Sequence, residues 1–209
     1  MSSMCHVWPV GLDVGEHRLH AGKLTGYEED IRVPLFVRGP GVPRGRVREE
    51  IVGNVDLAPT FADLAGAQVP DFADGRSIVP LLRGAGLSPP WRGAFLVEQA
   101  DVHFGPAAAA RQRQVLEPLD PMDVELAGAA ARPQQGVPAY SALRTATHAY
   151  VVHSTGEREL YDLGSDPYEL RNLAARAHPA LIARLGSWLE AFRKCRGAGC
   201  RVADVAPPR

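Results

Sequence analysis

The stretch that decides the fold is residues 140–163, which read YSALRTATHAYVVHSTGERELYDL. It contains three short runs in which β-branched and aromatic residues are frequent, at 140–145, 150–154 and 159–163. Residues 155–157, Thr-Gly-Glu, separate the second run from the third, and a short connection with a central glycine is typical of a hairpin. The stretch therefore predicts an antiparallel meander of three strands.

An amphipathic helix is expected after the meander. Pro179 suits the first turn of a helix, and apolar residues recur on one face to about Arg193. With the meander, this helix predicts a small C-terminal subdomain over residues 139–200, and residues 201–209 are expected to form a loose tail. The apolar face consists of Leu181, Ile182, Leu185, Trp188, Leu189 and Phe192.

The first part of the chain carries a different pattern. Residues 31–38 form a short apolar run that ends in a Gly-Pro-Gly turn, which indicates a buried strand. Asp56 is a candidate N-cap for a helix near 57–65, and residues 94–98 indicate a second buried strand. The order strand, helix, strand favours an α/β layer architecture for residues 1–99.

Residues 100–138 separate these two regions. They contain a run of alanines, scattered proline and glycine, and no sustained hydrophobic period. This composition predicts a variable loop or linker that is partly disordered.

Charge and hydropathy exclude several classes of partner. The 209 residues include 23 basic and 24 acidic side chains, so a net charge of −1 provides no strong attraction to nucleic acid. No apolar run approaches the roughly 20 residues of a membrane-spanning helix. The first eleven residues lack the basic and apolar regions of a signal peptide.

Two of the three cysteines are placed for a short disulfide. Cys195 and Cys200 are separated by Arg-Gly-Ala-Gly, and the glycines permit the tight turn that such a bond needs. A metal site would need further ligands nearby, and none follow in the sequence. A Cys195–Cys200 disulfide is therefore expected in an oxidising compartment, with Cys5 left over.

Several motifs occur in a consistent order. They are GEHRL at 15–19, GK at 22–23, YEEDIRVPL at 27–35, GNVDLAPT at 53–60, DGRS at 74–77, PLL at 80–82, ELYDL at 159–163 and DPYELRNL at 166–173. On these motifs the chain resembles the C-terminal portion of a bacterial arylsulfatase-type member of the sulfatase family. The resemblance covers roughly residues 11–195 apart from 100–138. It implies a partial alkaline-phosphatase-like α/β fold, with a remnant of the central sheet, a small C-terminal antiparallel sheet and a terminal α-helix.

The resemblance also implies the chemistry of a complete enzyme that acts on a sulfate ester. Such an enzyme uses a formylglycine made from Cys or Ser in a C/S-x-P-x-R motif, with Ca²⁺ or Mg²⁺ held by carboxylates and an Asn or His. Lys23 matches the family lysine that contacts the sulfate group, and His17 resembles a substrate-facing residue. By residue type alone, a solvated lysine and a structural or exposed histidine stay open. The full-length protein is expected to be secreted or periplasmic.

The sequence departs from the family at the metal and the nucleophile. Pro9 and Val10 stand where the resemblance places two metal ligands, and neither side chain coordinates a hard cation. Residues 28–30, Glu-Glu-Asp, are expected to serve in packing and capping, and Arg32 is expected to be structural as well. Residues 88–92, Ser-Pro-Pro-Trp-Arg, fit S-x-P-x-R literally, but they follow the lysine motif instead of preceding it.

Three functions are therefore compatible with the sequence. The first is a sulfuric ester hydrolase of arylsulfatase type, or a piece of one whose N-terminal half is missing. The second is a non-catalytic remnant or split-gene piece, and the third is a related phosphonate or phosphate-ester hydrolase. We expect this chain to retain no metal or cofactor, to be inactive alone, and to expose the apolar faces of the strand at 31–38. A paired metal role for His148 and His153 is not favoured.

Overall fold

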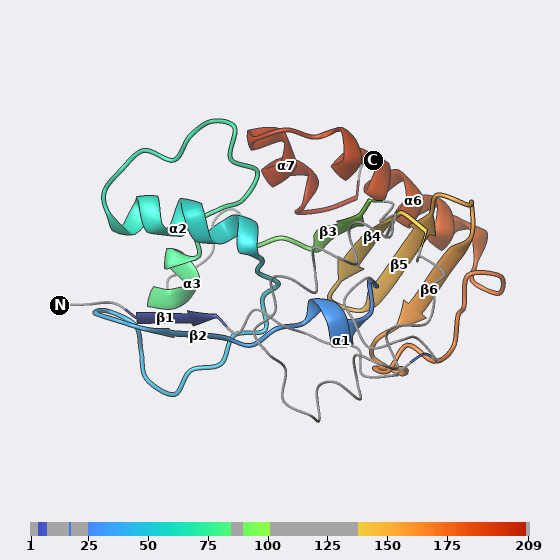
Figure 1. Ribbon diagram of the computed structural model, residues 1–209, viewed down its shortest axis with the longest axis horizontal. Helices are drawn as coiled ribbons and strands as arrows, with labels where there is room; N and C mark the ends of the chain where they lie inside the picture. Colours follow the sequence, from blue (N-terminus) through green and yellow to red (C-terminus); the bar gives the residue numbers. More distant parts are fainter. Residues whose placement is uncertain (1–3, 8–16, 18–24, 85–89, 101–137, 208–209) are drawn as a thin grey trace, which may run out of the picture.

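The two sheets of the structure account for every strand in its described part. The computed structural model describes residues 4–7, 17, 25–84, 90–100 and 138–207. Figure 1 shows a small sheet beside a larger one, which has four strands and is flanked by helices. The elements are β1 (Met4–Val7), α1 (Glu28–Ile31), β2 (Leu35–Arg38), α2 (Leu57–Leu64), α3 (Val79–Arg83), β3 (Ala94–Gln99), β4 (Tyr140–Thr145), β5 (His148–His153), β6 (Arg158–Asp162), α6 (Pro179–Lys194) and α7 (Ala198–Ala203).

The larger sheet is antiparallel throughout, in the order β3-β4-β5-β6. Its last three strands are the expected meander, with β5 beginning two residues earlier than expected. The hairpin between β5 and β6 turns at Gly156, whose φ of +92° lies in the region that favours glycine. The prediction of an antiparallel C-terminal sheet is confirmed.

One strand joins a different partner from the one that the sequence suggested. The apolar run at 94–98 was grouped with the strand at 31–38 in an α/β layer. In the structure it forms β3, which pairs along its whole length with β4, from Ala94 opposite Thr145 to Gln99 opposite Tyr140. An apolar run shows that a strand is buried but not which neighbour it pairs with, because that depends on contacts remote in sequence.

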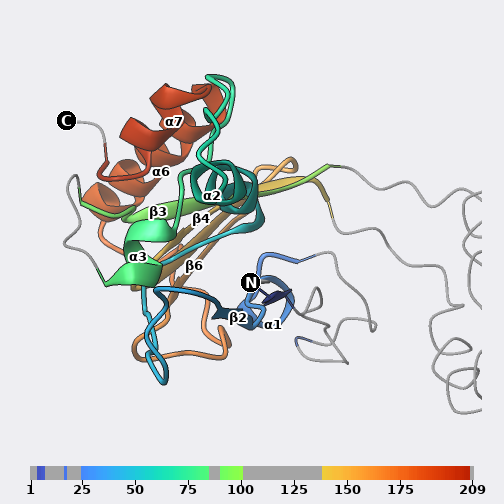
Figure 2. The same ribbon diagram turned by 90° about the vertical axis from the view of Figure 1, so that its left-hand side faces the viewer.

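Helix α6 covers one face of the four-stranded sheet. It begins at Pro179, where the His178 ring accepts a hydrogen bond from the Ala180 amide at 3.2 Å. Figure 2 shows α6 and α7 on one side of the sheet, and α1 and β2 on the other. The core between helix and sheet confirms the predicted apolar face and consists of Ala94, Leu143, Tyr150, Leu160, Leu185, Trp188, Leu189 and Phe192.

The strand expected at 31–38 is shorter and less buried than its composition suggests. Only residues 35–38 are extended, as β2, while residues 28–31 form the single turn α1. Strand β2 pairs antiparallel with β1, and alternate side chains stay exposed. Phe36 is 68% exposed, so the prediction of a buried strand is wrong at this position. The expectation that this strand presents an apolar side chain to solvent is confirmed.

The tail also differs from expectation. A disulfide joins Cys195 to Cys200, with their Cα atoms 4.9 Å apart, as predicted. Residues beyond it continue as α7 instead of a loose end, and Asp204 is only 4% exposed. The Trp188 indole donates to the Ala203 carbonyl oxygen at 2.6 Å, which fixes α7 against α6.

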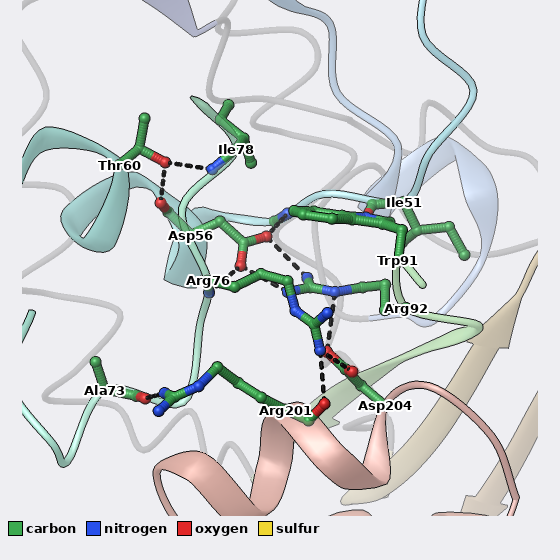
Figure 3. A network of polar contacts seen from close by, with 11 residues as sticks. Ile51, Asp56, Thr60, Ala73, Arg76, Ile78, Trp91, Arg92, Arg201 and Asp204 are labelled. Carbon is green, nitrogen blue, oxygen red and sulfur yellow. Dashed lines mark hydrogen bonds and ion pairs between the residues drawn. The ribbon is translucent and has the colours of Figure 1, made fainter. Parts of the chain in front are cut away.

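A buried charge network attaches α7 to the start of α2 (Figure 3). Arg92 donates to both carboxylate oxygens of Asp56, at 2.6 and 2.8 Å, and its Nε lies 3.2 Å from Asp204. Arg76 also pairs with Asp204 and donates to the Arg201 carbonyl oxygen at 2.7 Å. We call Asp56, Arg76, Arg92 and Asp204 the charge clamp.

The charge clamp corrects the role predicted for Asp56. Its side chain makes no capping bond to α2. Instead it accepts from the Gly53 and Arg76 amides, both at 2.9 Å, and from Arg92. Helix α2 still runs from 57 to 64, close to the predicted 57–65, and the charge clamp holds its amino end in place.

Candidate functional site

The candidate site surrounds the segment that carries the two predicted site residues. His17 is described, and Lys23 lies outside the described residues. The His17 ring stacks on the Tyr27 ring with centroids 3.8 Å apart and planes 12° from parallel. Its Nε2 lies 3.8 Å from a carboxylate oxygen of Glu29. The His17 backbone has a φ of +52°, in the left-handed region that residues other than glycine rarely occupy.

Tyr27 connects His17 to the four-stranded sheet. Its hydroxyl donates to Glu159 Oε2 at 3.1 Å, and the Tyr161 hydroxyl donates to the same oxygen at 3.0 Å. His153 Nε2 lies 3.0 Å from the other carboxylate oxygen. Burial, followed by the charge of Glu159, raises the pKa of Tyr27 to about 12. Tyr27 therefore stays protonated at neutral pH and remains a donor to Glu159.

A second contact attaches α1 to the sheet. The Arg144 guanidinium on β4 binds both carboxylate oxygens of Glu28, through Nε at 2.5 Å and Nη2 at 2.9 Å. Next to it, Gly26 packs over Tyr140 and Ala142, where an added Cβ would lie 3.3 Å from the Tyr140 ring. The segment therefore approaches the sheet closely and is held by hydrogen bonds on both sides.

Glu169 completes this cluster from the loop after β6. It is 2% exposed, and its Oε2 accepts the Glu28 amide at 2.7 Å. Burial raises the pKa of Glu169 to about 7, with the neighbouring carboxylates of Glu28 and Glu29 adding to the rise. The loop itself is fixed by Asn172, whose side-chain oxygen accepts the Leu160 amide at 3.1 Å.

Two of the acidic residues at 28–30, Glu28 and Asp30, have structural roles, as expected from the sequence. Glu28 binds Arg144, and Asp30 accepts from the Thr25 amide at 2.9 Å. Within the described ranges, no three His, Cys, Asp or Glu side chains converge on a point where a metal ion fits. These residues thus do not fit Ca²⁺ or Mg²⁺, and no step is assigned to a metal here. His148 and His153 contact Thr147 and Glu159 respectively.

The literal S-x-P-x-R match ends in a residue that is already engaged. Arg92 is buried within the charge clamp, and its side chain is 3% exposed. It also lies over the rings of Trp91 and Phe95, at 5.5 and 5.2 Å. A guanidinium bound to two carboxylates inside the protein is not available to a nucleophile. Residues 88 and 89 lie outside the described part of the chain.

A cleft of about 280 Å³ lies elsewhere, along β3 beside the disulfide. Leu96, Phe192 and Cys195 line it, which places it on the α6 face of the sheet. His17 belongs to the opposite face, so the cleft and the candidate site are separate. Among the helices of the described residues, none has the length and apolar character to cross a membrane.

Sequence reasoning missed the residues that hold the site in place. Tyr27, Glu159 and Glu169 were recognised only as parts of motifs. The signal was present, because each lies within one of the ordered motifs at 27–35, 159–163 and 166–173. Their mutual contact is not visible in sequence, since Tyr27 and Glu159 are 132 positions apart.

Among known proteins, the chain is similar to sulfatases. Residues 15–103 match the family described as N-sulphoglucosamine sulphohydrolase, C-terminal. The human N-acetylglucosamine-6-sulfatase is 31% identical over 95% of this chain, which corresponds to 36% of that protein. An extracellular sulfatase SULF-1 homolog of Drosophila melanogaster is 46% identical over 43% of this chain and 8% of its own length.

Solved structures show the same relation. One, described as a complex with its substrate D-glucosamine-2-N,6-O-disulfate, superposes with a TM-score of 0.66 at 27% identity, over 88% of this chain and 32% of that one. The phosphonate monoester hydrolase of Agrobacterium radiobacter superposes with a TM-score of 0.58 at 31% identity, over 82% of this chain and 30% of that one.

The fold is thus a partial alkaline-phosphatase-like sulfatase fold, mixed α/β with a small antiparallel sheet and C-terminal helices. The chain is therefore similar to sulfatases, and residues 15–103 resemble the C-terminal part of that class of enzyme. It spans about a third of the length of the human relative and of these two solved structures.

Proposed function

We propose that this chain forms part of the substrate site of a sulfatase-type hydrolase of sulfuric esters. Lys23 contacts the sulfate group and His17 faces the substrate. The observation that carries the proposal is the docking of residues 25–31 on the C-terminal sheet, because it fixes the end of the segment that bears both residues. Tyr27 is the centre of this docking, since it stacks on His17 and donates to Glu159.

The two side chains have distinct roles in such a site. The Lys23 ammonium stabilises the negative charge that grows on the sulfate oxygens and the leaving oxygen as the ester bond breaks. The His17 ring is oriented by its stack on Tyr27. A fixed orientation matters because misplacement of a contact by about 1 Å costs on the order of a hundredfold in rate.

The 209 residues do not perform the reaction alone under this proposal. The nucleophile motif is represented only by residues 88–92, whose Arg92 is held in the charge clamp. Pro9 and Val10 supply no oxygen or nitrogen side chain for a hard cation. Formylglycine and Ca²⁺ or Mg²⁺ therefore belong to the complete protein.

A sulfated amino sugar is the first substrate to test. The family of residues 15–103 and the human relative are both described as acting on sulfated glucosamine derivatives. The second candidate is a phosphonate monoester, because the Agrobacterium hydrolase is also 31% identical. A secreted or periplasmic location is supported by the Cys195–Cys200 disulfide and by the extracellular Drosophila relative.

The test begins with the genomic DNA upstream of Met1. If it encodes a C/S-x-P-x-R motif and carboxylate ligands, the joined protein is expected to hydrolyse glucosamine 6-sulfate, and Lys23→Ala to lower kcat about a hundredfold or more. Lys23→Arg is the matched variant that keeps the charge. A joined protein that hydrolyses the sulfate equally well with Lys23→Ala contradicts the assignment, and preference for a phenyl phosphonate monoester favours the second candidate.

A further inference from the structure

Glu169 accepts a hydrogen bond from the start of α1, although it lies far away in the sequence. It lies in the motif at 166–173 with a backbone φ of +52°, a conformation uncommon outside glycine. Its carboxyl group is buried and receives the Glu28 amide at 2.7 Å, while Oε1 has no hydrogen-bond partner among the described residues. The side chain of Tyr27, the N-cap residue of this turn, makes no capping hydrogen bond. Glu169 provides that cap from 141 positions away.

The loop that bears Glu169 is rigidly attached to the sheet. Asp166 accepts the amides of Leu170 and Arg171, at 3.1 and 2.8 Å. The Leu173 amide donates to the Leu160 carbonyl oxygen at 2.8 Å, which ties the end of the loop to β6. Because these hydrogen bonds hold the loop, the Glu169 carboxyl group is positioned at the start of α1.

We propose that Glu169 is a positioning residue whose buried carboxyl group holds the start of α1 and, through Tyr27, the ring of His17. Its effect on turnover rests on the function proposed above. Its effect on the segment does not, because the contact joins two residues of this chain, Glu169 and Glu28. Glu169 touches neither and acts only through the backbone that it holds.

The charges around Glu169 make this contact dependent on pH. The groups that face it are the carboxylates of Glu28 and Glu29, the Arg144 guanidinium and the Tyr27 hydroxyl. Burial and the two like charges raise the pKa of Glu169 by more than the Glu28 amide and Arg144 lower it, so the neutral carboxyl is favoured inside the protein up to a pH of about 7. An ionised Glu169 carboxylate is more stable in water than in the protein. The segment at 25–33 is therefore expected to open more often as pH rises.

The size of this effect follows from the two pKa values. If opening returns Glu169 to its ordinary pKa of 4.5 from about 7, the opening equilibrium rises about tenfold between pH 6 and pH 8. Glu169→Gln keeps an acceptor oxygen and cannot ionise, so its opening is expected to be independent of pH. Glu169→Ala removes the acceptor and is expected to raise opening about tenfold already at pH 6.

Amide hydrogen exchange on the 209-residue chain measures this directly. Peptides covering residues 25–33 report on the segment, those covering residues 148–153 report on the sheet, and rates are corrected for intrinsic exchange at each pH. Glu157→Ala is the matched control, because Glu157 is exposed in the β5–β6 hairpin. We expect Glu169→Ala to release 25–33 alone, Glu169→Gln to retain protection, and only the wild type and Glu157→Ala to lose protection with rising pH.

Two results overturn the proposal. One is unchanged exchange of 25–33 in Glu169→Ala, or an equal loss in 148–153. The other is a pH dependence of exchange at 25–33 that is the same in Glu169→Gln as in the wild type. This second comparison does not depend on the Glu169→Ala variant. Hydrolysis of glucosamine 6-sulfate by the joined protein with Lys23→Ala distinguishes the two proposals. Unchanged hydrolysis by the Lys23→Ala joined protein, with the exchange pattern as expected, contradicts the function and leaves the role of Glu169 intact.

Discussion

Replacing Arg92 by methionine is the sharpest test of the architecture. Arg92 binds both oxygens of Asp56 and lies 3.2 Å from Asp204, and all three side chains are at most 6% exposed. Methionine keeps an unbranched stem but no charge, so the change leaves Asp56 and Asp204 buried with fewer partners. Burial already raises the pKa of Asp204 against the lowering effects of Arg76 and Arg92.

The magnitude follows from what each carboxylate retains. Removing one partner of a buried ion pair typically costs about 3–5 kcal/mol, because the other charge is left buried and uncompensated. Asp56 keeps two backbone amides at 2.9 Å, and Asp204 keeps Arg76. We therefore expect the lower end, about 3 kcal/mol in the free energy of unfolding. For a domain of this size that is a fall in Tm of about 6–12 °C.

Urea unfolding followed by tryptophan fluorescence measures the loss, because Trp91 lies beside Arg92. Arg83→Met is the matched control on an exposed arginine of α3 and is expected to change stability by less than about 0.5 kcal/mol. The double variant with Asp56→Asn completes a cycle whose coupling energy should reach about 2 kcal/mol. A cost below 1 kcal/mol for Arg92→Met, or a coupling near zero, refutes the charge clamp as a stabilising element.

Three further predictions concern stability and solubility. Because folding raises the pKa of Glu169 from 4.5 to about 7, the free energy of unfolding of the wild type falls as pH rises through this window. The free energy of unfolding of Glu169→Gln should therefore exceed that of the wild type by up to about 3 kcal/mol at pH 8. Equal stability of the two at pH 8 in thermal melts contradicts a buried Glu169 carboxyl. Replacing Cys195 and Cys200 together by alanine should cost about 2 kcal/mol in urea, the entropy of a short closed loop, and a neutral result shows that the bond is dispensable. Phe36→Ser should slow aggregation in light scattering with unfolding energy unchanged within about 0.5 kcal/mol, whereas a large destabilisation places Phe36 in a core.

Local patterns predicted the C-terminal half of the fold well. The hairpin at 155–157 and the helix from Pro179 are determined by residues close in sequence, namely a glycine in a turn and a helical apolar period. The Cys195–Cys200 disulfide has the same basis, since only four residues intervene. Where the determinants are local, a single sequence contains enough information to locate the element.

Contacts between remote residues were not predictable in this way. Arg76 and Asp204 are 128 positions apart, so no local pattern indicated that residues after Cys200 would be ordered by burial of a carboxylate. Asp56 has the composition of an N-cap and became an ion-pair partner, because Arg92 reaches it from 36 positions away. The pairing of β3 with β4 depended likewise on the partner strand.

For the candidate site, the sequence located a segment but not its support. His17 was identified by resemblance, and the structure adds that it stacks on Tyr27 beside Glu29. The contributions of Glu159 and Glu169 come from the opposite end of the chain. Lys23 lies outside the described residues, so its contact with sulfate stays a prediction.

Release of sulfate from glucosamine 6-sulfate by the purified 209-residue chain, with Ca²⁺ or Mg²⁺ added, tests the central claim most directly. The chain is proposed to hold a sulfate-contacting segment, Lys23 and His17 docked on the C-terminal sheet, without the groups that break the ester bond. We expect no release above the uncatalysed rate for the wild type and for Lys23→Ala alike. Saturable release by the wild-type chain that Lys23→Ala abolishes would contradict this expectation.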